Sequence, residues 1–123
     1  MTKLQSSTLA PCPPKLELRD RPMLTPDLAV EAAGVFKILA SDTRLRLLHA
    51  LVRAGELCVT DLASTVEMKP QAVSNQLQRL VDRGILESRR NGNNIYYQIV
   101  DPCVVNLLDQ GLCLSEDARE RKQ

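Results

Sequence analysis

Apolar side chains recur every three to four residues along two stretches in the first half of the chain, which predicts two amphipathic helices. The first stretch follows Thr25, a residue suited to an N-cap, with Pro26 in the first helical position. The second stretch covers 43–54 and stops near Gly55. We expect the core-facing residues of these helices to be Leu28, Ala32, Val35, Phe36, Leu39, Leu45, Leu48, Leu51 and Val52.

Two shorter amphipathic helices are predicted next, joined by a tight turn. The first begins after Cys58 or Thr60, and Met68 lies in the connection. The second begins at Pro70, where the missing N–H costs nothing, and ends at Gly84. The inward-facing residues of the two helices are expected to be Leu62, Ala63, Val66, Val73, Leu77 and Leu80.

The pattern then changes to the alternation that is typical of β-strands. Strands are predicted at Ile85–Arg90 and Ile95–Ile99, with turn residues at Asn91–Asn94 between them. Two helices joined by a tight turn and followed by a hairpin are the order of a winged helix-turn-helix. In that fold, one helix lies in the major groove of DNA.

A last helix is predicted to start near Asp101 and Pro102, again a cap followed by proline. It is strongly apolar, through Val104, Val105, Leu107, Leu108 and Leu112. One small monomer cannot easily bury this whole surface, so we expect a homodimer. The charged residues after Ser115 are expected to fray.

The predicted fold is mainly α, with about five helices and a small β-hairpin as the wing, in a homodimer. Residues 1–24 contain four prolines and little periodicity, and they are predicted to form a flexible arm. The DNA-binding and dimerisation domain is expected at 25–114, and a charged tail at 115–123.

Composition narrows the class of protein. Apolar residues make up 44% of the 123 residues, but there is one Phe and no Trp, so aliphatic side chains must fill the core. No run of 18 apolar residues occurs, and the N-terminus lacks the apolar core of a signal peptide, which predicts a cytoplasmic protein without a membrane partner. No nucleophile–base pair or phosphate-cradling glycine loop is evident, so we expect neither an enzyme nor an organic cofactor.

Charge is concentrated where DNA contacts are expected. The net charge of the chain is only +1, but Lys69 to Gly92 holds five basic and two acidic residues, a local +3. The side chains expected to read base edges are Gln71, Ser74, Asn75 and Gln78. Those expected to contact the DNA backbone or an adjacent minor groove are Lys69, Arg79, Arg89 and Arg90. A dimeric interaction module that does not bind DNA is the alternative.

The four cysteines are Cys12, Cys58, Cys103 and Cys113. In a reducing compartment, they are more often ligands or sensors than disulfides. Cys103 and Cys113 are ten residues apart on the predicted last helix, or roughly 15 Å along its axis, so one helix cannot bring both to one ion. Two antiparallel copies could pair them across a dimer; alternatively, Cys58 joins Cys12. The single histidine, His49, is expected to be a packed helix residue.

Four segments together resemble the ArsR/SmtB family of metal-responsive repressors, over about Val30 to Leu114. They are LASDTRLRLLHAL (39–51), ELCVTDLA (56–63), QAVSNQLQRLVDRGIL (71–86) and NGNNIYYQI (91–99). The resemblance implies a homodimeric winged-helix repressor that binds operator DNA without metal and releases it when metal binds. It also implies that the first and last helices form the dimer interface.

The chain departs from the family pattern at the metal sites. Many relatives carry ELCVCDL, whereas Thr60 replaces the second cysteine here and Cys58 is retained. Cys12 could complete that site, as arm cysteines do in relatives. On the last helix, Asp101 matches the first ligand of the family's other site, and Cys103 falls where a histidine is usual. Thiols thus replace the zinc-type ligands.

Soft sulfur ligands indicate a thiophilic effector. With few thiols in each site, we expect mercury(II) first, then arsenite, and then cadmium or lead. A repressor on the same fold that senses oxidants or persulfides through its thiols is the alternative function.

Overall fold

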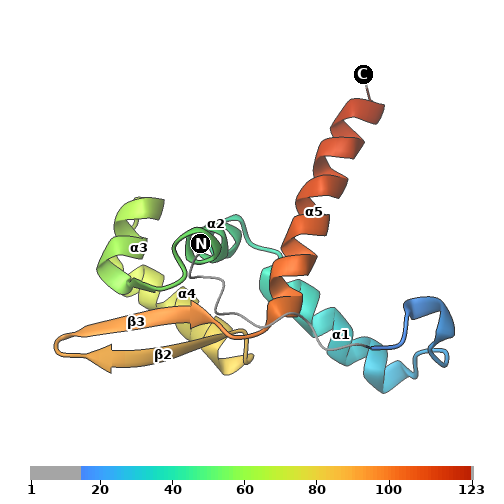
Figure 1. Cartoon of the computed structure of the whole chain (residues 1–123), viewed down its shortest axis with the longest axis horizontal. Coiled ribbons are helices and arrows are strands. Elements are labelled where there is room, and N and C mark those ends of the chain that lie inside the picture. Colours follow the sequence, from blue (N-terminus) through green and yellow to red (C-terminus); the bar gives the residue numbers. More distant parts are fainter. Residues whose placement is uncertain (1–14, 123) are drawn as a thin grey trace, which may run out of the picture.

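The computed structural model describes residues 15–122 and confirms a mainly α winged helix-turn-helix (Figure 1). Cys12 lies outside the described residues. The elements in chain order are η2 (Leu18–Asp20), α1 (Pro26–Leu39), α2 (Asp42–Ala54), β1 (Leu57–Cys58), α3 (Val59–Val66), α4 (Pro70–Asp82), β2 (Leu86–Asn91), β3 (Asn94–Ile99) and α5 (Pro102–Arg121).

Helix starts follow local capping chemistry. The Thr25 hydroxyl accepts a hydrogen bond from the Leu28 backbone N–H at 3.2 Å, which confirms the predicted cap of α1. The Asp101 carboxylate does the same for Cys103 N–H at 2.9 Å in α5. Proline is the first residue of α1, α4 and α5, where its fixed φ favours the first turn.

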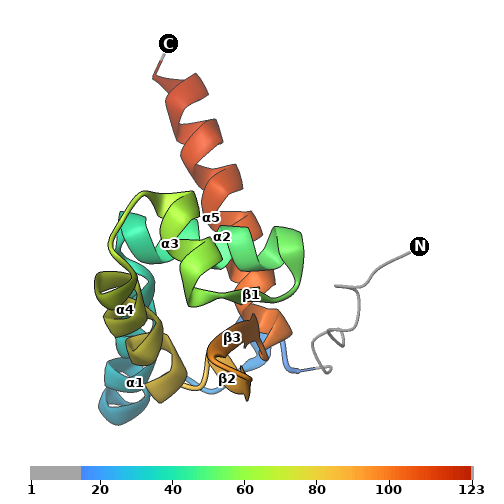
Figure 2. The same cartoon turned by 90° about the vertical axis from the view of Figure 1, so that its left-hand side faces the viewer.

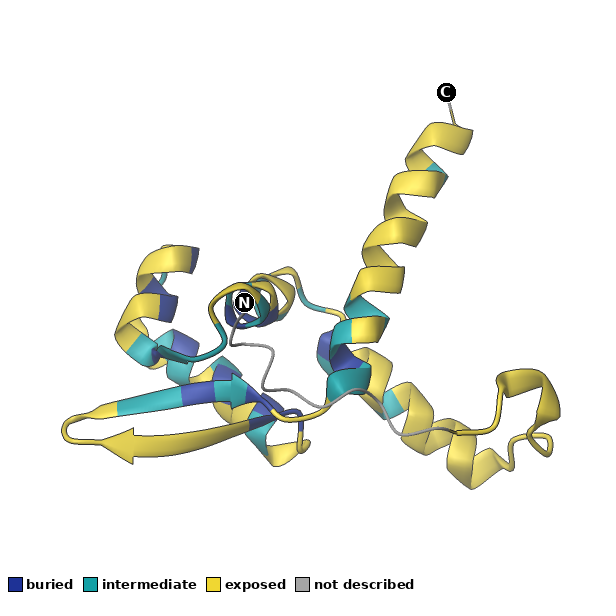
Figure 3. Cartoon of the chain, viewed as in Figure 1, coloured by how far each residue is buried: buried dark blue, intermediate teal, exposed yellow. Residues whose placement is uncertain are grey.

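The core lies where α2, α3 and α4 pack against one another and the sheet, as the buried positions in Figure 3 show. Its fully buried side chains are Leu47, Leu48, Leu51, Leu62, Val73, Leu77 and Leu80. The prediction that Leu45 faces the core was wrong, because it is 41% exposed while Leu47 is fully buried. Leu48 and Leu51 are buried as predicted, so the buried face of α2 differs from the expected one in having Leu47 in place of Leu45.

A three-stranded antiparallel sheet has the order β1-β3-β2. Asn91 pairs with Asn94, which leaves Gly92 and Asn93 as the turn, and Gly92 has a φ of +66°. Glycine adopts this left-handed conformation without the steric cost of a Cβ. The sequence pattern did not predict β1, because a strand of two residues carries no periodicity.

Of the predicted core positions of α1, Leu39 is buried, but Leu28, Val35 and Phe36 are exposed by 50%, 39% and 58% in the single chain. No element of the described chain covers this face of α1. Helix α5 likewise projects away from the rest of the molecule in both views (Figures 1 and 2). The apolar Leu112 and Leu114 on its outer half are 59% and 63% exposed.

Helix α5 continues to Arg121, so the expected fraying after Ser115 is not observed. Its last turns carry opposite charges three and four residues apart, at Glu116 and Arg119 and at Asp117 and Arg121. Pairs with these spacings stabilise a helix by about 0.2–0.5 kcal/mol each. Among residues 15–122, no helix has the length and apolar character needed to cross a membrane.

Candidate DNA interface and thiol site

The turn between α3 and α4 orients the candidate recognition helix. Glu67 adopts a left-handed conformation at φ 57° and ψ 47°, and the Met68 N–H donates to the Ala63 carbonyl at 3.0 Å. The extended Lys69 then leads into Pro70. This reversal lets both helices bury their apolar faces in one core, so the polar face of α4 is left on the surface.

That polar face carries the predicted base-reading residues. Gln71, Asn75 and Gln78 are exposed, and Ser74 is half-buried. Gln71 Nε2 donates to Asn75 Oδ1 at 3.2 Å, and Gln78 Nε2 donates to Asp82 Oδ1 at 2.9 Å. These amides therefore lie along one side of α4 with partners that DNA bases could replace.

The predicted basic contacts flank this face. Lys69 lies at the start of α4, Arg79 lies near its end, and both are exposed, as are Arg89 and Arg90 on β2. All eight residues remain predicted DNA contacts.

Arg44 anchors α4 from the inside, a role that the sequence pattern does not indicate. Its Nε donates to the Ile38 carbonyl at 2.6 Å, and its Nη1 donates to Gln76 Oε1 at 2.7 Å. Arg44 thus joins the end of α1 and the start of α2 to the middle of α4. The partner on α4 is 32 residues away, so no local pattern could have indicated it.

On the wing, Arg89 makes a bidentate ion pair with Glu56. Arg89 Nε lies 2.8 Å from Glu56 Oε2, and Arg89 Nη2 lies 2.7 Å from Oε1. The guanidinium also lies 5.0 Å from the centre of the Tyr96 ring. This hydrogen bonding lowers the pKa of Glu56 against a smaller opposing effect of desolvation. The ion pair is therefore present above the ordinary pKa of a glutamate and is lost as the pH falls through the lowered value.

The described cysteines lie on two different elements. Cys58, 8% exposed, occupies the N-cap position of α3 without a side-chain capping bond and pairs with Tyr96 in the sheet. Cys103 is half-buried in the first turn of α5, and Cys113 is exposed near its middle. None of these three forms a disulfide. Within residues 15–122, no cluster of three or more His, Cys, Asp or Glu residues could hold a metal ion.

Both α5 thiols have polar neighbours. Lys15 Nζ lies 3.7 Å from Cys103 Sγ, and Cys113 Sγ lies 3.8 Å from Asp117 Oδ2. Because α5 is one continuous helix, the separation of about 15 Å along the axis that we expected for Cys103 and Cys113 applies. One chain therefore cannot bring both thiols to one ion. The Lys15 contact places the start of the described chain beside Cys103.

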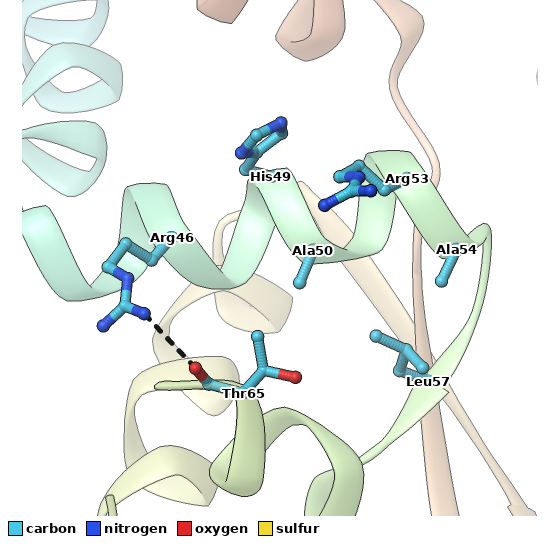
Figure 4. Close-up of a pocket in the computed structure, with 7 residues that line it drawn as sticks. All are labelled: Arg46, His49, Ala50, Arg53, Ala54, Leu57 and Thr65. Atoms are coloured by element: carbon cyan, nitrogen blue, oxygen red, sulfur yellow. Dashed lines mark hydrogen bonds between the residues drawn. The ribbon is translucent and has the colours of Figure 1, made fainter. Parts of the chain in front are cut away.

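The expectation that His49 is packed was wrong, because it is exposed on α2. It lies above a cleft of about 460 Å³ between α2 and α3, between the guanidinium-bearing Arg46 and Arg53 (Figure 4). Arg46 Nη2 donates to the Thr65 carbonyl at 3.2 Å. The apolar residues on either side of His49 in the sequence face the core, whereas its own position faces solvent.

Comparison with known proteins decides the family. The model of the family "Bacterial regulatory protein, arsR family" matches residues 41–88. The cadmium resistance transcriptional regulatory protein CadC of Listeria innocua is 35% identical over 85 residues, covering 69% of this chain and 71% of CadC. The chain belongs to the ArsR/SmtB family. This family consists of metal-responsive transcriptional regulators with a winged-helix fold.

Two further members of the family are similar over most of the chain. The transcriptional regulator NmtR of Mycobacterium tuberculosis is 39% identical over 103 residues, covering 82% of this chain and 85% of NmtR. The crystal structure of AntR, an antimony-specific transcriptional repressor, is 62% identical with a TM-score of 0.75, covering 89% of this chain and 98% of AntR.

Proposed function

We propose that the chain is a homodimeric repressor that binds operator DNA through α4 and the wing and releases it when a thiophilic metalloid binds thiolates at α5. The observation that carries this proposal is the position of Cys103 and Cys113 on a single projecting helix with an apolar surface. A ligand that binds there would change how the two copies are oriented relative to each other. This reorientation would change the spacing of their two α4 helices.

The DNA contact is supported by the polar face of α4. Amide side chains such as Asn75 can form bidentate hydrogen bonds with adenine in the major groove. Arg79 and Lys69 can bind phosphates, which position the helix without reading sequence. A dimer would bind two half-sites separated by about one helical turn of DNA.

Asn75→Ala and Arg79→Ala are expected to affect DNA binding in different ways. Asn75→Ala should reduce discrimination at one base pair by about 1–3 kcal/mol and leave the salt dependence unchanged. Arg79→Ala should weaken binding to all duplexes alike and reduce the salt slope by about one. Fluorescence anisotropy with operator variants at several salt concentrations measures both. Equal effects of the two substitutions on all sequences would argue against base reading by Asn75.

The dimer is supported by the apolar surfaces of α1 and α5. A cavity of about 700 Å³ opens between α1, α2 and α5, and Phe36, Leu108 and Leu112 are among its lining residues. The same elements carry several of the large apolar residues that the described chain leaves exposed, among them Leu28, Phe36, Leu45 and Leu112. A second copy would bury them, and burial contributes about 25 cal/mol per Å² of apolar surface.

Leu112→Glu is expected to convert the dimer into a monomer, because it would place an unpaired charge in the interface. The residue is 59% exposed in the single chain, so the fold of each monomer should persist. Gln110→Glu, on the same helix but not lining the cavity, adds the same charge and serves as the control. Sedimentation velocity measures the mass. A Leu112→Glu protein that remained dimeric would exclude this surface as the interface.

The effector site is proposed to combine thiols of both copies. Cys103 of one chain would approach Cys113 of the partner subunit if the two α5 helices run antiparallel. Lys15 contacts Cys103, and Cys12 is only three residues before Lys15, a reach of at most about 11 Å. Cys12 could therefore supply a third thiolate. Cys58 is buried in the sheet and is the least suited of the four.

Three thiolates change the preferred ion. Two would suit mercury(II), whereas three suit trivalent antimony or arsenic. The antimony specificity stated for AntR, at 62% identity, supports antimonite as the first candidate. Arsenite follows, and mercury(II), cadmium and lead come after it. Three thiols that bind antimonite, Sb(OH)3, give up their protons to its three hydroxides, so three waters leave and no net proton is released. Binding of mercury(II), cadmium or lead instead releases protons and should strengthen as the pH rises.

Sensing by thiol oxidation or persulfidation is the second candidate function. A disulfide requires Cα atoms within about 7 Å, which excludes a bond between Cys103 and Cys113 of one chain but permits one across a dimer. Mass spectrometry after treatment with peroxide or sulfide distinguishes this function from metalloid binding, because only the covalent product survives denaturation.

A further inference from the structure

The outer part of β2 is not anchored by apolar burial. From Glu87 to Asn91 every side chain of this strand is exposed, and Leu86 is its one buried residue. Figure 1 shows the hairpin projecting beyond the helices. Backbone pairing with β3 holds this strand in the sheet, so side-chain contacts are what can add to the position of the wing relative to α4.

One side chain of β2 reaches across the whole sheet. Arg89 lies opposite Tyr96 on the central strand β3, and Tyr96 lies opposite Cys58 on β1. The Arg89 guanidinium lies over the Tyr96 ring and then binds both carboxylate oxygens of Glu56, just before β1. The planar fork of arginine matches a carboxylate in this two-bond geometry, which fixes direction as well as distance.

We infer that Glu56 and Arg89 form a latch that fixes the wing against the domain, so that Arg89 serves DNA binding by positioning the wing and not by contacting phosphate. This inference rests on the proposed DNA-binding function. Glu56 already compensates the charge of Arg89 in the free protein, and a phosphate would have to displace this carboxylate. Arg90, which pairs with Ile95 and is exposed, is the wing arginine left to contact DNA.

The latch is not expected to contribute much to global stability. The side chains of Arg89 and Glu56 are 52% and 30% exposed, and ion pairs at such sites change unfolding little. Its effect should instead appear in the mobility of residues 87–94 and in DNA affinity.

The two possible roles of Arg89 predict opposite effects of Glu56→Gln. If Arg89 contacts phosphate, removing the carboxylate frees its charge, and DNA affinity rises. If Arg89 is part of a latch, Glu56→Gln and Arg89→Gln each weaken binding by about two- to fivefold, the effect expected of an exposed ion pair. The double variant should then be no weaker than either single variant, because both remove the same contact.

A variant in which the two charges are exchanged tests whether the ion pair alone restores DNA affinity. Glu56→Arg combined with Arg89→Glu restores an ion pair across the sheet but places an acid on β2. The latch predicts recovery toward wild-type affinity, whereas a phosphate contact predicts the weakest binding of the series. Glu87→Gln is the matched control, since Glu87 lies on the same strand and accepts a hydrogen bond from Gln98 within the wing. It should leave affinity unchanged or raise it slightly.

Amide order parameters from nuclear magnetic resonance test the latch without DNA. We expect Glu56→Gln to increase the mobility of residues 87–94 and Glu87→Gln not to do so. Unchanged mobility, or tighter DNA binding by Glu56→Gln, would overturn the latch. A wild-type protein that binds no duplex would instead refute the proposed function, while the mobility measurement would still decide the latch.

Discussion

Cys103→Ser is expected to leave operator binding intact and to abolish release by antimonite. Serine preserves the size of the side chain and the cap at Asp101, but its hydroxyl is not a soft ligand. Allosteric coupling between two sites is typically about 1–3 kcal/mol, which corresponds to a roughly 5- to 150-fold change in DNA affinity. Without the Cys103 thiol, antimonite should no longer change the affinity for DNA. Operator anisotropy with and without saturating antimonite measures it.

Cys58→Ala is the control for that substitution. Cys58 is buried between β1 and α3 and lies on a different element from the α5 thiols, so its loss should cost some stability but keep the metalloid response. Cys113→Ser should match Cys103→Ser if both thiols form one site across the dimer. Loss of the response in Cys58→Ala alone would place the site at the start of α3, as in relatives with the ELCVCDL motif.

Leu77→Ala is expected to lower the free energy of unfolding by about 2–5 kcal/mol, a large part of the 5–15 kcal/mol typical of a domain. Leu77 is fully buried in the middle of α4, so truncation leaves a cavity beneath the candidate recognition helix. Urea unfolding at fixed protein concentration measures the change, because dimerisation couples to stability.

The neighbouring Gln78→Ala is the matched control for Leu77→Ala. Gln78 is exposed on the opposite face of α4, so its effect on unfolding should stay within about 0.5 kcal/mol. A loss of under 1 kcal/mol for Leu77→Ala would contradict the packing described for α4.

Local signals explain how much of the fold was predictable. The helix starts at Thr25 and Asp101 depend on hydrogen bonds within three residues, and the start at Pro70 depends on the fixed φ of proline; the sequence contains all of these signals. The two-residue β1 has no such signal. The exposure of Phe36 also could not be predicted for one chain, because an amphipathic pattern shows that a face is apolar but not which chain covers it.

In the candidate sites, too, features with a local sequence signal were predictable and long-range contacts were not. The polar face of α4 followed from helical spacing, because the apolar residues Val73 and Leu77 fix which side faces the core. The pairing of Arg89 with Glu56 joins residues 33 apart, and neither has a pattern that indicates the other. Arg89 was therefore assigned to DNA from its charge alone. Which cysteines bind the effector depends on a second copy of the chain. The sequence of one chain therefore names the candidate cysteines but not their grouping into one site.

Titration of the protein–operator complex with antimonite tests the central claim most directly. We expect the wild-type complex to dissociate as metalloid binds, with loss of titratable thiols at the same stoichiometry, and the variant without its four cysteines to remain bound. Dissociation of that variant at the same antimonite concentration, or a wild-type complex that stays intact at saturation, would contradict release through cysteine thiolates.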